Sequence, residues 1–362
     1  MALGVGSTAY GLYQFYSIFT MWPEEVRGDL RAGIKAKHQN DLNLSERYLR
    51  RAWETAQTLP LVRFSAEPHL KLSGIAIALA EVLEANDRPQ PAYEVYSGAL
   101  SQLQNVQGLS GRERMRAVSI AAKLGEMAEV YQQPPEEEER WLTWAVEEVL
   151  HIVREGQPRE TVNVEGASAD TPMMLAELDL PVWVSKSDVG APLEALGKFY
   201  AREGKPEYAT ALYLQATSLL IPPPASKRQA STEELCRGAQ LMNNLSDLML
   251  QGPPPDNQRN AEKWARQSLS IIEKAKASAK GNVDGIDICE HTLAAVLFNL
   301  GSLLEMAGDY KQSAGLYKAS LDQSNRIGMR EGTMQARFAL RRIERAVNKQ
   351  SAATSSSTTE AA

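Results

Sequence analysis

The sequence predicts an all-α protein, built as a solenoid of about six antiparallel helix pairs. Apolar residues recur at spacings of three and four from Glu24 to about Gln350, which is the period of amphipathic helices. Gly, Pro, Asn and Asp separate these periodic segments, as they do between helices. Similar pairs of segments also recur along the chain, and such self-similarity is typical of repeat architectures.

The composition is that of an ordinary globular protein. The 362 residues are 43% hydrophobic and 23% charged, with a formal net charge of −6. An acidic chain without a dense Lys/Arg stripe is a poor nucleic-acid binder, so we expect no nucleic-acid partner. Two cysteines and four scattered histidines offer no cluster at ligand spacing, so we expect no metal site.

Residues 1–23 carry no charged side chain and are long enough to cross a bilayer, which needs roughly 20 apolar residues. Trp22 stands where an interfacial anchor would lie. We therefore predict a single transmembrane helix over 1–23. A secretory signal is disfavoured because the segment has no basic residue. A soluble apolar cap helix is the other alternative, because Ser, Thr, Gln and three glycines weaken the membrane signal. Since the chain starts inside the apolar run, we also expect that a preceding targeting segment is missing.

The clearest helix pair covers residues 193–220, and a second copy covers residues 299–321. In each copy the first helix carries a glycine, Gly197 or Gly301. The second helix carries an aromatic residue at the same offset, Tyr213 or Tyr317. This pattern of small residues facing aromatic ones resembles the tetratricopeptide repeat (TPR) family, whose two helices pack closely.

Four weaker copies share these small and apolar positions. Their markers are Gly33 with Ser45 and Leu49, Ala80 with Ala92 and Tyr96, Gly125 with Glu138 and Leu142, and Ser246 with Ala261 and Ala265.

The predicted organisation follows from the copies. Pairs one to three occupy 24–153, pairs four to six occupy 191–327, and 328–350 forms a C-terminal cap helix. The insertion 154–190 is predicted to be an ordered loop or, alternatively, a flap over the groove, and 351–362 to be a disordered tail.

Catalysis finds no support, because no Ser/His/Asp order, Cys/His pair or carboxylate dyad falls at matched positions. We expect neither an enzyme nor a cofactor. A helical solenoid instead presents a groove lined by the first helix of each pair, which suits peptide recognition. The TPR framework places these candidate groove residues: Ile77, Glu81, Glu126, Glu194, Lys198, Arg202, Asn243, Asp247, Phe298, Ser302 and Glu305.

The groove differs from that of TPR cochaperones, which bind chaperone C-termini through a clamp of Lys and Asn. Leu30 and Ile34 stand where the clamp needs these residues, and Glu81, Glu126 and Glu194 would repel a carboxylate. A mixed groove of acids, amides and apolar side chains suits extended or partly unfolded segments.

Two further segments narrow the resemblance: MWPEEVRGDLRAGIKAKH after the apolar run, and LPVWVSKSDVGAPLEALGKFYAREG before the fourth pair. With the apolar N-terminus, they resemble the fungal TPR subunit that serves as substrate adaptor of the i-AAA protease. The resemblance implies an anchor in the mitochondrial inner membrane and a TPR domain facing the intermembrane space. It also implies delivery of unfolded proteins to that protease. The alternatives are a TPR scaffold for assembly of a respiratory-chain complex and a soluble cytosolic TPR interaction protein.

Cys236 and Cys289 fall on the first helices of neighbouring pairs. An intermembrane-space location would permit a disulfide between them. We nevertheless expect buried free thiols, the common state of cysteine on packed helices.

Overall fold

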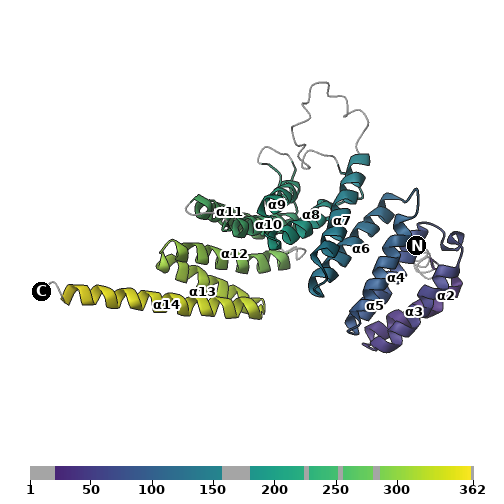
Figure 1. Ribbon diagram of the computed structural model, residues 1–362, viewed down its shortest axis with the longest axis horizontal. Coiled ribbons are helices and arrows are strands. Elements are labelled where there is room, and N and C mark those ends of the chain that lie inside the picture. Colours follow the sequence, from purple (N-terminus) through teal and green to yellow (C-terminus); the bar gives the residue numbers. More distant parts are fainter. Residues whose placement is uncertain (1–20, 157–179, 224–227, 252–255, 280–285, 360–362) are drawn as a thin grey trace, which may run out of the picture. The chain divides into compact units, whose positions relative to one another are not determined.

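The computed structural model describes residues 21–156, 180–223, 228–251, 256–279 and 286–359, with side chains up to residue 348. It has two compact units, Met1–Gly156 and Gln157–Ala362. In the described residues every regular element is helical, which confirms the all-α prediction (Figure 1).

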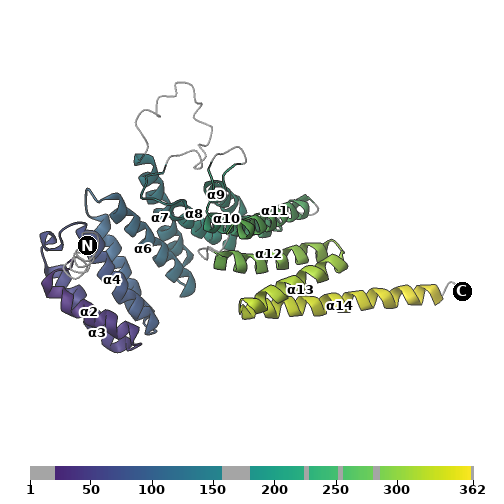
Figure 2. The same cartoon turned by 180° about the vertical axis from the view of Figure 1, so that it is seen from behind.

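Unit 1 consists of three antiparallel helix pairs that follow one another along the chain, with a short 3₁₀ helix, Leu61–Phe64, before the second pair. Each helix packs against the next, and the views from the two sides agree (Figures 1 and 2). The pairs are α2 (Glu24–His38) with α3 (Leu42–Thr58), α4 (Pro68–Ala85) with α5 (Pro89–Gln104), and α6 (Gly111–Val130) with α7 (Pro135–Glu155).

Unit 2 repeats this arrangement and ends in a long helix that packs on the last pair. Its elements are α8 (Lys186–Arg202) with α9 (Pro206–Leu220), α10 (Thr232–Met249) with α11 (Asp256–Ser278), α12 (Ile286–Met306) with α13 (Tyr310–Arg326), and α14 (Arg330–Thr359). The six predicted pairs are therefore present.

The helices begin where the sequence supplies a start signal. A serine and an acidic residue three positions later cap α6, α8 and α10 reciprocally, for example Ser185 with Asp188. Proline opens α4, α5, α7 and α9, where its missing N–H leaves no helical bond unmade. Three glutamates in the first turn of α7, Glu136, Glu137 and Glu138, complement the helix dipole.

In four of the six pairs the predicted close approach rests on a glycine: Gly33, Gly125, Gly197 or Gly301. A Cβ added at Gly33 would lie 2.7 Å from Cγ of Leu49, and one at Gly125 would lie 2.6 Å from Cδ2 of Leu142. Small hydroxyl residues strengthen the same contact, because the Ser45 hydroxyl donates to the Gly33 carbonyl at 2.8 Å. The marker offsets thus identify the residues at which the two helices touch.

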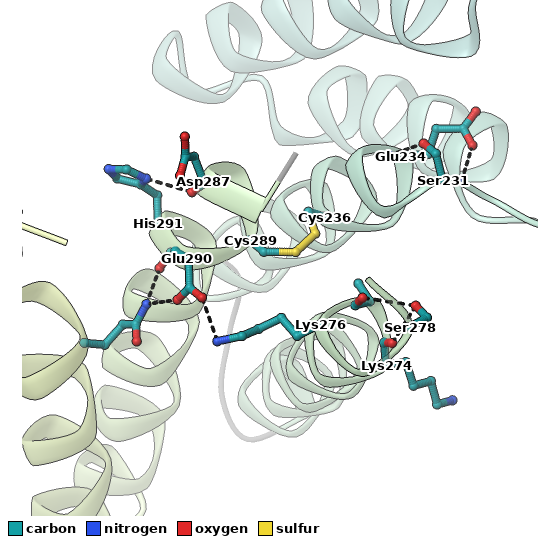
Figure 3. Close-up of a disulfide and its surroundings, with 12 residues drawn as sticks. Ser231, Glu234, Cys236, Lys274, Lys276, Ser278, Asp287, Cys289, Glu290 and His291 are labelled. Atoms are coloured by element: carbon teal, nitrogen blue, oxygen red, sulfur yellow. Dashed lines mark hydrogen bonds and ion pairs between the residues drawn. A yellow bond between two sulfur atoms is a disulfide. The ribbon is translucent and has the colours of Figure 1, made fainter. Parts of the chain in front are cut away.

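Both cysteines are fully buried, and the structure joins them in a disulfide (Figure 3). The expectation of free thiols was wrong. Cys236 on α10 and Cys289 on α12 face one apolar cluster, which brings their Cα atoms to 4.9 Å, within disulfide range. The bridge therefore links the first helices of two neighbouring pairs.

A buried carboxylate stands next to this bridge (Figure 3). Glu290 accepts from Lys276 Nζ at 2.9 Å and pairs with Arg326, and Gln323 Nε2 donates to its backbone oxygen at 2.9 Å. Burial alone would raise the pKa of Glu290, but hydrogen bonds from Lys276, Gln323 and Arg326 hold it below its usual value. The ionised Glu290 thereby ties α11 and α13 to α12.

Two predicted boundaries differ from the structure. Helix α8 begins at Lys186, inside the predicted insertion 154–190, because the Ser185–Asp188 capping box starts it there. Helix α14 runs on to Thr359, through most of the tail predicted to be disordered. The chain has neither Gly nor Pro after Gly332, so nothing in the sequence interrupts the helix. Most of the insertion, 157–179, lies outside the described residues.

Residues 1–20 of the predicted transmembrane helix also lie outside them, and Met21, Trp22 and Pro23, which are described, are not helical. Among the described helices, α12 alone has the length and mean hydropathy, 1.2, of a membrane span. Half of that stretch is buried against neighbouring helices, and it contains Cys289 of the disulfide and buried Glu290. Its apolar character is accounted for by its place in the core of unit 2.

Candidate protein-binding grooves

An open cavity of about 390 Å³, here called the unit 1 cavity, lies between α4 and α6, with Tyr96 of α5 in its wall. Ile77 and Glu81 from α4, which the sequence placed in the groove, both line it. Arg116 and Lys123 from α6 line it as well, with Ile120 between them. These two cations were missed. The signal was available, because Arg116, Ile120 and Lys123 are spaced by four and three and so share one helix face.

The acids around the unit 1 cavity are paired with lysines. Lys37 Nζ lies 2.6 Å from Glu81, and Lys123 Nζ lies 3.1 Å from both Glu84 and Glu126. The Tyr96 hydroxyl donates to Glu84 at 3.1 Å, and burial together with that carboxylate raises the pKa of Tyr96. Glu81 and Glu126 therefore each have a lysine partner, and Lys123 is shared between Glu84 and Glu126.

A second cavity, of about 530 Å³, lies between α8 and α10 in unit 2 and is here called the unit 2 cavity. It brings together Glu194 and Lys198 from α8 with Asp247 from α10. Amide side chains of α10 and of the following residues share its wall with Tyr213, while alanines and Leu248 supply apolar surface. Three predicted groove residues thus meet at one site.

Two carboxylates at this cavity are raised in pKa. Burial is the main cause at Glu194, only partly offset by the charges of Arg237 and Lys198. At Asp247, loss of hydration raises the pKa to about 6, against a hydrogen bond from Asn299 that acts in the other direction. Asp247 as a whole residue is nonetheless exposed to solvent. At both carboxylates, the charges and hydrogen bonds that the protein supplies only partly replace the lost hydration.

The side chains of Asn243 and Asn299 form an amide pair next to Asp247. Asn299 Nδ2 donates to the Asp247 carboxylate at 2.8 Å and to Asn243 Oδ1 at 3.1 Å. Asn243 is buried and does not line the unit 2 cavity, so its role here is to position Asn299. Burial, with the charges of Glu194 and Asp247, raises the pKa of Tyr213 to about 12, so the phenol stays protonated.

The predicted groove residues of α12 are engaged within the protein. Glu305 accepts from Arg342 Nε and Nη2 at 2.6 Å each and from the Tyr317 hydroxyl at 2.7 Å. The Phe298 ring packs against that of Tyr317 in a tilted arrangement, with ring centroids 5.1 Å apart. Ser302 lowers the pKa of Tyr317, against the effect of burial. These residues fasten α13 and α14 to α12, and none of them lines the unit 1 or the unit 2 cavity.

Arg202 likewise lies outside the unit 2 cavity. It occupies the last turn of α8, where its guanidinium lies 5.6 Å from the centre of the Phe199 ring and 3.9 Å from Glu203. A residue on the first helix of a pair therefore does not necessarily line a cavity.

No family model matches the chain. A TPR repeat-containing protein of Schizosaccharomyces pombe is 27% identical over 154 residues, which is 42% of this chain. The chain matches about 40% of the length of that curated relative.

Two solved structures share the fold. The apo form of RapI superposes with a TM-score of 0.52 at 11% identity, over 91% of this chain and 73% of RapI. BtubC (BKLC) of P. vanneervenii gives a TM-score of 0.51 at 18% identity, over 79% of this chain and 90% of its own.

Repeated antiparallel helix pairs that stack one after another define a class, that of helical-repeat (α-solenoid) proteins. Within that class, the pair pattern and the relative from S. pombe support a TPR protein.

Proposed function

We propose that the chain is a non-enzymatic adaptor, which binds unfolded or partner proteins in the grooves of its first helices. It would recruit them to the i-AAA protease of the mitochondrial inner membrane for quality-control degradation. The observation that carries the binding role is the unit 2 cavity, where Glu194 and Asp247 are partly desolvated beside amides and apolar side chains.

The lining of the unit 2 cavity fits an exposed polypeptide backbone. Gln240, Asn244 and Gln251 each offer both a donor and an acceptor, so they can satisfy peptide groups of any sequence. Alanines and Leu248 provide apolar surface for side chains between those groups. This combination favours segments with unpaired backbone amides, which folded proteins rarely expose.

Recruitment to a membrane protease draws its support from the sequence. The uncharged run 1–23 would fix the chain at the bilayer, and attachment raises the effective concentration of a bound client near a membrane partner. The two segments that resemble the i-AAA adaptor form α2 with the residues before it, and α8 with its capping box.

The test of client binding uses the purified full-length chain and a reduced, carboxymethylated model protein that stays unfolded. Asn244→Lys places a long cation in the unit 2 cavity and should lower the affinity for this client about tenfold, a loss of ~1.4 kcal/mol. The matched control is Gln267→Lys, on an exposed position of α11 away from the cavity. Equal affinities for both variants would remove the unit 2 cavity from the binding surface.

The test of recruitment is co-precipitation from mitochondria with a tagged chain. Recovery of the i-AAA protease, reduced when residues 2–22 are deleted, is the expected result. Co-migration with a respiratory-chain subcomplex instead would select the assembly-scaffold alternative. Recovery of the full-length chain in the cytosolic fraction would select the soluble one.

A further inference from the structure

A third cavity, of about 640 Å³, opens between α2 and α4 in unit 1 and is here called the Trp22 pocket. Its surface is predominantly apolar, with Trp22, Leu30 and Ile34 on one side and Ile75 and Ala78 on the other. It differs in this from the two mixed cavities described above. A pocket of this size and character suits one or more large apolar side chains.

The charged residues that line the Trp22 pocket are all basic. Arg27, Arg31, Lys35 and His38 follow one another on α2 at spacings of four, four and three, so they form one stripe beside the apolar wall. No Asp or Glu is among the described residues that line it. In a chain of net charge −6, this is a local concentration of positive potential.

One of these cations is incompletely satisfied. Arg27 Nη2 donates to the Trp22 carbonyl at 2.8 Å, which orients the guanidinium at the pocket. Its Nε is buried and has no hydrogen-bond partner among the described residues. The Arg27 side chain is therefore held at the pocket by its bond to the Trp22 carbonyl, with its Nε already removed from water.

The position of the pocket on α4 favours a polypeptide as its occupant. Gly74, Ile75 and Ala78 of α4 face the Trp22 pocket, while Ile77 and Glu81 of the same helix face the unit 1 cavity. Positions this close on one helix are separated by about 1.5 Å per residue, so a short segment can reach from one cavity to the other.

We propose that the Trp22 pocket binds an acidic amphipathic segment of a partner protein. Apolar side chains of the segment fill the pocket, and its carboxylates pair with the basic stripe of α2. The inference rests on the proposed role as a protein-binding scaffold and adds the chemistry of a partner. This binding mode differs from that of the chaperone-tail clamp. Here Leu30 and Ile34 belong to the apolar wall of the pocket, and the negative charge of the bound segment comes from its side chains and not from a C-terminal carboxylate.

The test measures fluorescence anisotropy of two labelled peptides with the purified full-length chain. Both peptides carry the same Leu and Phe anchors, one flanked by Glu and the other by Lys. We expect the Glu peptide to bind at least about tenfold more tightly at low salt and to lose this advantage as salt rises. Equal binding of the two peptides would overturn the proposal.

Two substitutions locate the site. Lys35→Glu should weaken the Glu peptide about tenfold. The control Arg47→Glu makes the same kind of reversal on exposed α3, outside the pocket, and should change little. Ala78→Phe fills the pocket without a change of charge and should weaken both peptides. If Arg47→Glu weakens the Glu peptide as much as Lys35→Glu does, the stripe is not its site and the proposal fails.

Other occupants give distinct results. Binding to vesicles of anionic phospholipid that requires Lys35 and displaces the Glu peptide would make lipid the occupant and overturn the proposal. A gain of more than tenfold in peptide affinity on deletion of residues 2–20 would make the chain's own N-terminus the occupant.

The outcome is separable from the broader function. Unfolded clients are tested with Asn244→Lys in unit 2, and the acidic peptide with Lys35→Glu in unit 1. Loss of one binding activity with retention of the other shows which proposal has failed.

Discussion

The ring of Tyr213 lies directly against the backbone of Gly197, so closely that a Cβ on residue 197 would stand 2.7 Å from ring atom Cε1. Gly301 meets Tyr317 in the same way, with a Cβ at 2.9 Å from Cδ1. Both tyrosines are buried, so neither ring can move aside into solvent. The approach of the two helices in these pairs therefore depends on glycine.

The first prediction concerns this contact. Gly197→Ala should destabilise unit 2 by about 1–3 kcal/mol, because the added methyl overpacks a closed interface. Denaturant unfolding, followed by circular dichroism, measures the change. Gly315→Ala is the matched control in the same unit, since nothing lies within 4 Å of its added Cβ. There the better helix propensity of Ala should stabilise by up to about 1 kcal/mol. Equal effects at the two sites would contradict the packing argument.

The second prediction concerns the disulfide. Replacement of both Cys236 and Cys289 by Ala should lower the stability of unit 2 by about 2–4 kcal/mol, because the unfolded chain loses a cross-link. A reductant should lower the Tm of the wild-type chain and leave that of the double variant unchanged. Titration of two free thiols in the unfolded, unreduced protein would refute the bridge.

The third prediction concerns the tie between α12 and α14. Hydrogen bonds from Arg342, with a smaller contribution from Tyr317, hold the pKa of Glu305 below its usual value. A depressed carboxyl pKa stabilises the folded state above the unfolded value of 4.5, and this contribution disappears as pH falls through the folded value. Arg342→Met should cost about 1 kcal/mol near pH 7, since the arginine is itself partly exposed, and almost nothing near pH 3.

The control for this pH dependence is Arg337→Met on an exposed position of the same helix. Denaturant melts of both variants across the acid range provide the comparison. A penalty for Arg342→Met that stayed constant with pH would show that the lost packing, and not the charge, matters.

The fourth prediction concerns Asp247, whose pKa lies at about 6. A raised carboxyl pKa has the opposite sign: folding favours the protonated form, so ionisation removes stability between the unfolded value of 3.8 and about 6. Asp247→Asn should therefore raise the Tm of unit 2 at pH 7 and leave it unchanged below about pH 4. A variant that is less stable at pH 7 would mean that the ionised carboxylate is stabilising.

The sequence predicted those parts of the fold that depend on local pattern. Gly33, Gly125, Gly197 and Gly301 identified the close contacts, because the facing residue stands at nearly the same offset each time. The start of α8 was missed, although the Ser185–Asp188 capping box that determines it is itself a local signal.

The candidate site was less predictable, because it depends on how neighbouring helices are rotated. Glu194 and Asp247 meet at one cavity, whereas Glu305, at a similar repeat position, is bound by Arg342 from the cap helix. The cation that pairs with Glu305 is Arg342, 37 residues away, and the one that pairs with Glu81 is Lys37, 44 residues away. No local sequence pattern covers such separations. The disulfide was missed for the same reason, since only packing brings α10 and α12 together.

The disulfide also has a mechanical consequence. Cys236 and Cys289 are 53 positions apart, and the bond between them closes a covalent ring that contains all of α11. A pulling force applied along the chain passes through the sulfur atoms and bypasses the residues of the ring. That stretch cannot be extended into a thread until the bond is reduced. The fifth helix pair can therefore lose its tertiary contacts under load without being drawn out to its full contour length.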